Sequence, residues 1–173
     1  MSKGSVLILV GPEYEELEVW YPLYRSREEG VEAILVGPEA GVTYPSKVGY
    51  PALSEKGANS VAMKDYDCLI IPGGYAPDHL RRHRAINQIV ADAMQLNKVV
   101  GAICHAGWML CSAPGALRGR KVTSFFAIKD DMVNAGAEWA DAEVVRDGNL
   151  ITSRKPDDLP AFMRTIIVAL GGS

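Results

Sequence analysis

Cys104 and His105 are the residues of this 173-residue chain whose types and spacing point most directly to chemistry. The five apolar residues before them, 99–103, are typical of a short strand buried on both faces, and the pattern becomes helical from Ala106. Cys104 is therefore expected at a sharp strand-to-helix turn, the nucleophile-elbow geometry. A helix N-terminus favours a thiolate, so the pattern indicates a nucleophile. The simpler alternative is one more small buried residue.

The elements that must position this turn alternate as in an α/β domain. Buried strands are predicted at 5–10, 31–36, 66–71 and 99–103, and helices at 13–29, 85–96 and 156–170. Between them we expect a β-hairpin excursion within 39–61, short helices from 77, from 106 and over 128–134, a brief strand at 122–124, and a hairpin of 142–145 with 150–153. Pro22 should kink or break the first helix. The sum is a single domain, residues 1–173, with a three-layer α/β/α sandwich and a mainly parallel central sheet.

Three strand ends carry polar or glycine-rich residues, at 11–16, 72–78 and 104–105. In open α/β sheets, ligands bind outside the carboxyl ends of the strands. The sequence therefore predicts that these three segments meet at one site.

Composition and charge narrow the classes of function. The net charge of −3 favours neither nucleic acid nor an anionic membrane as a partner, and no apolar run has the length of a membrane span. Three cysteines without a CxxC motif argue against a disulfide framework and for a reducing compartment. The first residues lack the features of a signal peptide, so we expect a cytoplasmic protein.

Neither a cofactor nor a metal is predicted. The turn after the first strand holds one glycine rather than GxGxxG, which disfavours a dinucleotide site. His79 and His83 have helical i,i+4 spacing, but no HExxH glutamate or third ligand accompanies them.

Six ordered blocks carry a resemblance to a known family. They lie at 13–18 (EYEELE), 71–77 (IPGGYAP), 102–105 (AICH), 117–124 (LRGRKVTS), 129–139 (KDDMVNAGAEW) and 153–159 (SRKPDDL). Over nearly its whole length the chain resembles the ThiJ/PfpI family of the class I glutamine amidotransferase-like superfamily. It looks closest to the PfpI-type intracellular proteases, also described as protein deglycases. The resemblance implies a flavodoxin-like sandwich.

The resemblance also implies roles for particular residues. Cys104 matches the nucleophile, and His105 matches a histidine completed by an acid from a neighbouring subunit. Asp78 matches that acid, although relatives have the longer Glu there. Glu15 matches the carboxylic acid beside the thiol, and the backbone N–H groups of Gly74 and His105 would hold an oxyanion. We therefore expect a homo-oligomer that shares its site.

Taken without the resemblance, these residues have plainer interpretations. Glu15 and Asp78 are acids of the kind found in first turns of helices, and Gly74 follows the end of a strand. Cys68 and Cys111 are expected to be packing residues.

The function implied is that of a cysteine-dependent hydrolase or lyase acting on carbonyl substrates, of the deglycase or glyoxalase type, on methylglyoxal and its adducts. One alternative is an intracellular cysteine peptidase acting on peptides. Another is a redox-sensing or chaperone-like stress protein without turnover, in which Cys104 oxidises to sulfinate. A glutamine amidotransferase is disfavoured, because residues 152–154 (TSR) stand where a His-x-Glu would be needed.

Overall fold

The computed structural model describes residues 4–172. Residues 1–3, which belong to the segment expected to lack a signal peptide, and residue 173, the last of the predicted domain, lie outside the described residues. A seven-stranded sheet in the order β10-β11-β7-β6-β1-β2-β5 forms the centre. Its strands are β1 (Ser5–Leu9), β2 (Glu32–Gly37), β5 (Lys56–Gly57), β6 (Cys68–Ile71), β7 (Val99–Ile103), β10 (Val144–Asp147) and β11 (Leu150–Ser153). All neighbours pair in parallel except β10 with β11.

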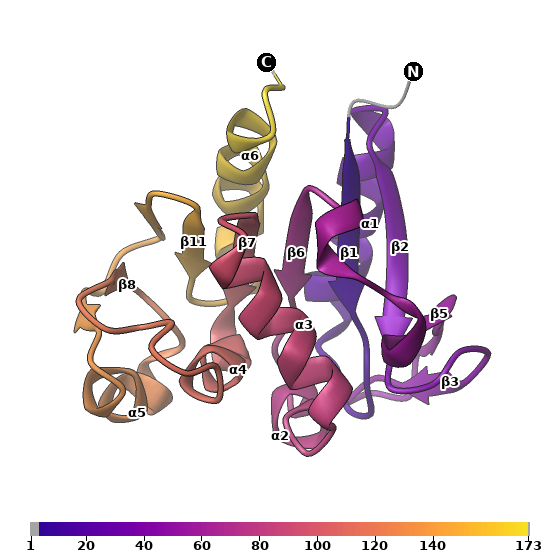
Figure 1. Cartoon of the computed structure of the whole chain (residues 1–173), viewed down its shortest axis with the longest axis horizontal. Helices are drawn as coiled ribbons and strands as arrows, with labels where there is room; N and C mark the ends of the chain where they lie inside the picture. Colours follow the sequence, from indigo (N-terminus) through magenta and orange to yellow (C-terminus); the bar gives the residue numbers. More distant parts are fainter. Residues whose placement is uncertain (1–3, 173) are drawn as a thin grey trace.

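Helices cover both faces of this sheet, which confirms the three-layer sandwich. The α-helices are α1 (Glu16–Glu28), α2 (Ala76–Leu80), α3 (Arg84–Gln95), α4 (Gly107–Cys111), α5 (Lys129–Asn134) and α6 (Leu159–Ala169). Helix α3 packs on β6 and β7 at the front in Figure 1, whereas α1 and α6 pack against each other on the opposite face. The carboxyl ends of β1 and β2 point toward the lower edge of this view, where α2 and α4 lie.

The central strands agree with the sequence prediction because their residues are buried on both faces. Every residue of β6 and β11, and every residue after the first in β1 and β7, is buried. Strands enclosed by helices on both sides read as continuous apolar runs rather than alternating ones.

The first helix differs from its prediction in two ways. It begins at Glu16 rather than Glu13, because Glu13 has a left-handed backbone (φ 57°) and Glu15 is the N-cap. It also runs through Pro22 without interruption. Val19 and Leu23, buried on either side of this proline, pack into the core. Tertiary packing thus offsets the loss of the backbone hydrogen bond that proline cannot donate.

The excursion between β2 and β6 contains the predicted hairpin. Strands β3 (Thr43–Pro45) and β4 (Pro51–Leu53) pair antiparallel, and the chain then adds β5 to the sheet edge, which the sequence did not predict. Two short 3-10 turns, η1 (Ala58–Ser60) and η2 (Met63–Asp65), lead on to β6. The hairpin is tied to the start of α1, since Tyr14 bridges to Ser46 and its hydroxyl donates to the carbonyl of Tyr50 at 2.8 Å.

The C-terminal third contains the predicted short helix, hairpin and final helix with small shifts, but its brief strand pairs with a second strand that the sequence did not predict. Strands β8 (Lys121–Val122) and β9 (Glu138–Trp139) form a separate parallel pair around η4 (Phe126–Ile128) and α5. The hairpin of β10 and β11 turns at Gly148, and a 3-10 turn, η5 (Pro156–Asp158), precedes α6. Within residues 4–172, no helix has the length and apolar character needed to cross a membrane.

Candidate active site

Cys104 lies at the strand-to-helix turn that the sequence predicts. Strand β7 ends at Ile103, and a 3-10 turn, η3 (Cys104–Ala106), leads into α4. The backbone of Cys104 is left-handed, with φ 62°. For a residue with a Cβ this conformation costs about 1–3 kcal/mol and is characteristic of functional sites. The strain orients the thiol toward the carboxyl edge of the sheet while leaving it only 8% exposed.

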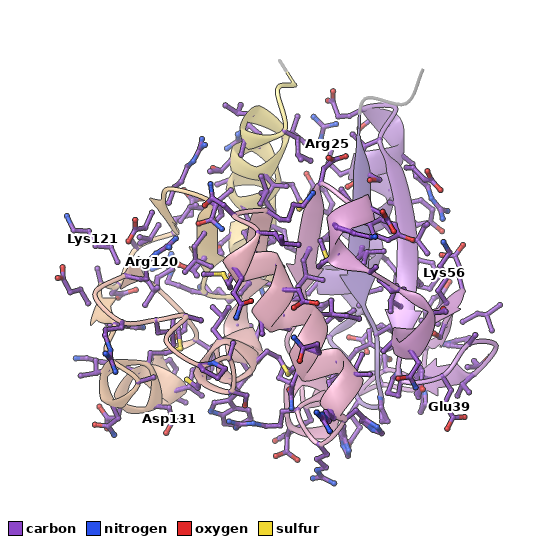
Figure 2. All side chains as sticks on the ribbon, viewed as in Figure 1. Arg25, Glu39, Lys56, Arg120, Lys121 and Asp131 are labelled. Carbon is purple, nitrogen blue, oxygen red and sulfur yellow. The ribbon has the colours of Figure 1, made fainter. Side chains whose placement is uncertain are left out.

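The imidazole of His105 is held beside this thiol. Its Nδ1 lies 3.3 Å from Sγ of Cys104. The ring stacks on Phe125 at a centroid distance of 4.9 Å and meets Trp108 edge-on at 5.1 Å. Trp108 is itself anchored, because its Nε1 donates to Oδ2 of Asp131 at 2.8 Å; Figure 2 labels Asp131 on α5. Burial, and next the positive charge of Lys47, lower the pKa of His105, so the ring is a neutral proton acceptor at pH 7.

Gly74 brings a second backbone donor to the sulfur. The N–H groups of Gly74 and His105 both donate toward Cys104 Sγ. A Cβ on Gly74 would lie 2.5 Å from the carbonyl oxygen of Glu13 and 2.6 Å from the nitrogen of Glu15, and φ is +72°. Only glycine fits here, and its N–H and that of His105 converge on the sulfur.

The carboxyl beside the thiol belongs to Glu18, so the assignment of this position to Glu15 is wrong. Glu18 is fully buried, accepts the N–H of Gly73 at 2.6 Å through Oε2, and hydrogen-bonds to the Cys104 side chain. A Cβ on Gly73 would meet both groups, at 2.6 Å from Glu18 Oε2 and 3.1 Å from Cys104 Sγ. Glu15 instead caps α1 by accepting the N–H of Glu18 at 2.9 Å. The two glutamates are three residues apart, and no local pattern distinguishes the one that points inward from the one that caps the helix.

Burial governs the protonation of Glu18 and Cys104. Burial, with a smaller contribution from the negative charge of Glu15, raises the pKa of Glu18 to about 8. It also raises the pKa of Cys104, which an ionised Glu18 raises further and the N–H groups of His105 and Gly74 lower. The expectation that a helix N-terminus, together with a carboxyl beside the thiol, lowers the pKa of Cys104 is therefore wrong in direction, since α4 has only five residues and burial outweighs it. Below about pH 8, Glu18 is neutral, so the repulsion is absent and its O–H can donate to a thiolate.

Asp78 is not brought to the thiol within the chain. It lies on α2, about half exposed, where it pairs with Arg82 one turn later. In the part of the chain that the structure describes, Nε2 of His105 has no hydrogen-bond partner. That nitrogen remains open to an acid from outside the subunit.

Cys104, His105, Gly74, Glu15 and Glu18 line one pocket of about 220 Å³. A larger hollow of about 370 Å³ lies between η1 and α3, but neither cysteine nor histidine lines it. Residues 4–172 contain no group of three or more His, Cys, Asp or Glu arranged to hold a metal ion. The other two cysteines lie elsewhere, Cys68 buried in β6 and Cys111 at the end of α4, and all three are unpaired.

Comparisons with known proteins identify the family and agree with the fold. The model of the DJ-1/PfpI family matches residues 4–169. A deglycase of Pyrococcus horikoshii is 44% identical, covering 96% of this chain and 99% of its own, and protein/nucleic acid deglycase 2 of Escherichia coli is 40% identical over 99% of both. A two-domain protein of Anabaena variabilis with DJ-1/ThiJ/PfpI-like and ferritin-like domains superposes with a TM-score of 0.95 at 36% identity, over 98% of this chain and 48% of that one. The chain belongs to the DJ-1/PfpI family.

Proposed function

We propose that the protein is an enzyme in which Cys104 attacks the carbonyl carbon of small substrates. The observation that carries this proposal is the convergence on one strained, buried sulfur of His105 Nδ1 at 3.3 Å and two backbone donors. Sulfur donates an electron pair to form the C–S bond, and the carbonyl π electrons move to oxygen. His105 takes the thiol proton, while the N–H groups of Gly74 and His105 hold the oxyanion.

Methylglyoxal and its adducts with amino groups are the substrates we favour. Two relatives at 40–44% identity are named deglycases, and the pocket of about 220 Å³ suits a small group. An adduct RNH–CH(OH)–CO–CH₃ and one water would give the amine RNH₂ and lactic acid. The aldehyde-level carbon is oxidised as the neighbouring ketone carbon is reduced, so the reaction needs no external oxidant.

Product analysis tests this activity. Purified protein is incubated with methylglyoxal, with methylglyoxal-treated N-acetyl-lysine and with an unmodified peptide, and lactate, free amine and new peptide ends are measured. We expect lactate and amine release that Cys104→Ala abolishes and Cys111→Ala, on the neighbouring helix, retains. Peptide cleavage that depends on Cys104, without lactate, would instead favour the peptidase.

A redox-sensing role makes a different prediction for the same sulfur. Two molecules of hydrogen peroxide would oxidise the thiolate to sulfinate, each leaving as water. Stable sulfinate at Cys104 under mild peroxide, with no turnover of any carbonyl substrate, would support the sensor and refute the enzyme. The unpaired cysteines fit a reducing cytoplasm as the place of either activity.

We further propose that Asp78 of a neighbouring subunit completes the site. Support comes from the open Nε2 of His105 and from the half-exposed position of Asp78 on α2. Asp78→Ala should lower turnover without unfolding the subunit. When Asp78→Ala and Cys104→Ala chains are co-expressed, mixed oligomers should recover activity, because some interfaces pair intact residues. A fully active monomer in light scattering, or no complementation, would refute the shared site.

A further inference from the structure

Two lysines reach the candidate active site from separate parts of the chain. Lys47 comes from the hairpin between β3 and β4, and Lys155 comes from the segment after β11. Both line the pocket of about 220 Å³ that contains Cys104. Neither side chain takes part in the bond-forming or proton-transfer steps proposed for Cys104.

Lys47 is placed by a hairpin held in a fixed shape. Its backbone N–H donates to the carbonyl of Tyr14 at 3.0 Å, and the hydroxyl of Ser46 accepts from the N–H groups of Val48 and Tyr50 at 3.2 and 2.9 Å. Glu16, from the first turn of α1, accepts a further bond from Val48 at 3.1 Å. These contacts fix the position from which the lysine side chain extends over the pocket.

The ammonium group of Lys47 keeps donors available. Among the described residues its one ion pair is with Glu15, at an Nζ–Oε1 distance of 3.5 Å, and the side chain is 44% exposed. An ammonium has three donors, so a ligand in the pocket can be bound while the contact with Glu15 persists.

Lys155 is placed by its neighbours and only weakly neutralised. The preceding residue, Arg154, is fixed by Asp158 and Asp141 at 2.9 and 2.8 Å, and Pro156 follows. Lys155 itself pairs with Asp157 at 3.1 Å, but that carboxylate is 81% exposed. Exposed surface pairs of this kind contribute little free energy, so a ligand can replace Asp157 as the partner of Lys155.

The charges lining the pocket are therefore unequal. Glu18 stays neutral to about pH 8, and the negative charge of Glu15 is matched by Lys47. Lys155 adds a positive charge, and the pocket lining contains no further ionised carboxylate to balance it. A neutral carbonyl compound would make no use of this charge.

We propose that Lys47 and Lys155 form an anion subsite, and that the preferred substrate carries a carboxylate near the carbonyl-derived carbon that Cys104 attacks. This inference rests on the proposed function and narrows its substrate class. Methylglyoxal adducts of free amino acids have this form, because the α-carboxylate lies two bonds from the modified nitrogen.

The matched reagents iodoacetate and iodoacetamide test the subsite without turnover. They differ in a carboxylate against an amide, and both alkylate Cys104. The rate constant for iodoacetate divided by that for iodoacetamide is measured at Cys104 by peptide mass mapping. Because both reagents react with the thiolate, this ratio cancels any change in the thiolate fraction. We expect this ratio to be higher for Cys104 of the wild type than for the free thiol of glutathione. It should fall about five- to tenfold in Lys47→Met and in Lys155→Met.

Two further variants make the test specific. Lys155→Arg keeps the charge and should keep the ratio. Lys121→Met removes a lysine that points outward from β8 at the edge of the molecule in Figure 2, and it should change the ratio less than about twofold. An equal fall in Lys121→Met would assign the effect to net charge and overturn the subsite.

The remaining outcomes separate this inference from the proposed function. An unchanged ratio in Lys47→Met or in Lys155→Met, with turnover of methylglyoxal adducts intact, overturns the two-lysine subsite alone. If neither reagent labels Cys104 and no carbonyl compound is turned over, the proposed function fails and takes the subsite with it.

Discussion

Replacing Glu18 with glutamine should change how the stability of the protein depends on pH. The pKa of Glu18 is raised from 4.5 to about 8 by burial. A carboxyl with a raised pKa in the folded state keeps its proton to a higher pH in the folded chain than in the unfolded chain. Its contribution to stability is therefore fully present below about pH 4.5 and is lost as the pH rises to about 8.

The size of this loss follows from the shift. The rise from 4.5 to about 8 corresponds to about 5 kcal/mol of unfolding free energy. Glutamine has nearly the same shape and does not titrate. The free energy of unfolding of Glu18→Gln minus that of the wild type should therefore rise by up to about 5 kcal/mol between pH 4.5 and 8.5.

Guanidinium unfolding under reducing conditions, repeated at several pH values, measures this difference. Glu28→Gln is the matched control, since Glu28 is exposed at the far end of the same helix, with 75% of its side chain accessible. For the control, the difference should stay within about 0.5 kcal/mol across the range. A difference for Glu18→Gln that is equally flat would show that Glu18 ionises in the folded protein as it does in water, and would refute the neutral-donor role.

Three further predictions concern the remaining parts of the site. Gly74→Ala should lose activity and destabilise the fold by at least about 2 kcal/mol, measured by thermal unfolding, because its Cβ would lie 2.5 Å from a carbonyl oxygen; wild-type stability would refute the close approach. Iodoacetamide should label Cys104 well before Cys68, because Cys104 opens into the pocket whereas Cys68 is fully buried in β6, and equal labelling in mass mapping would contradict the site. Phe125→Ala removes the ring that stacks on His105 at 4.9 Å, so kcat should fall more than KM rises, and Phe125→Tyr should restore kcat; a change confined to KM would refute this positioning.

The sequence by itself determined the architecture and the position of the nucleophile candidate. Apolar runs such as 66–71 and 99–103 predict strands enclosed on both faces, because a strand without a polar face has no side for water. The abrupt change from strand pattern to helix pattern after Ile103 placed Cys104 at the elbow. Local patterns of this kind survive folding, since burial and backbone preference act in the same direction there.

Only the tertiary structure decided which groups surround the sulfur. Glu15 and Glu18 are three residues apart at the start of α1. Glu18 accepts the N–H of Gly73 and meets the thiol, whereas Glu15 caps the helix. The direction in which the pKa of the Cys104 thiol shifts likewise depends on burial, which no local pattern encodes. Lys47 and Lys155 are 108 positions apart in the chain, so their place at one pocket follows from packing of the hairpin and of β11. Electrostatics act through space, and for that reason the chemistry of the site was the part least accessible from sequence.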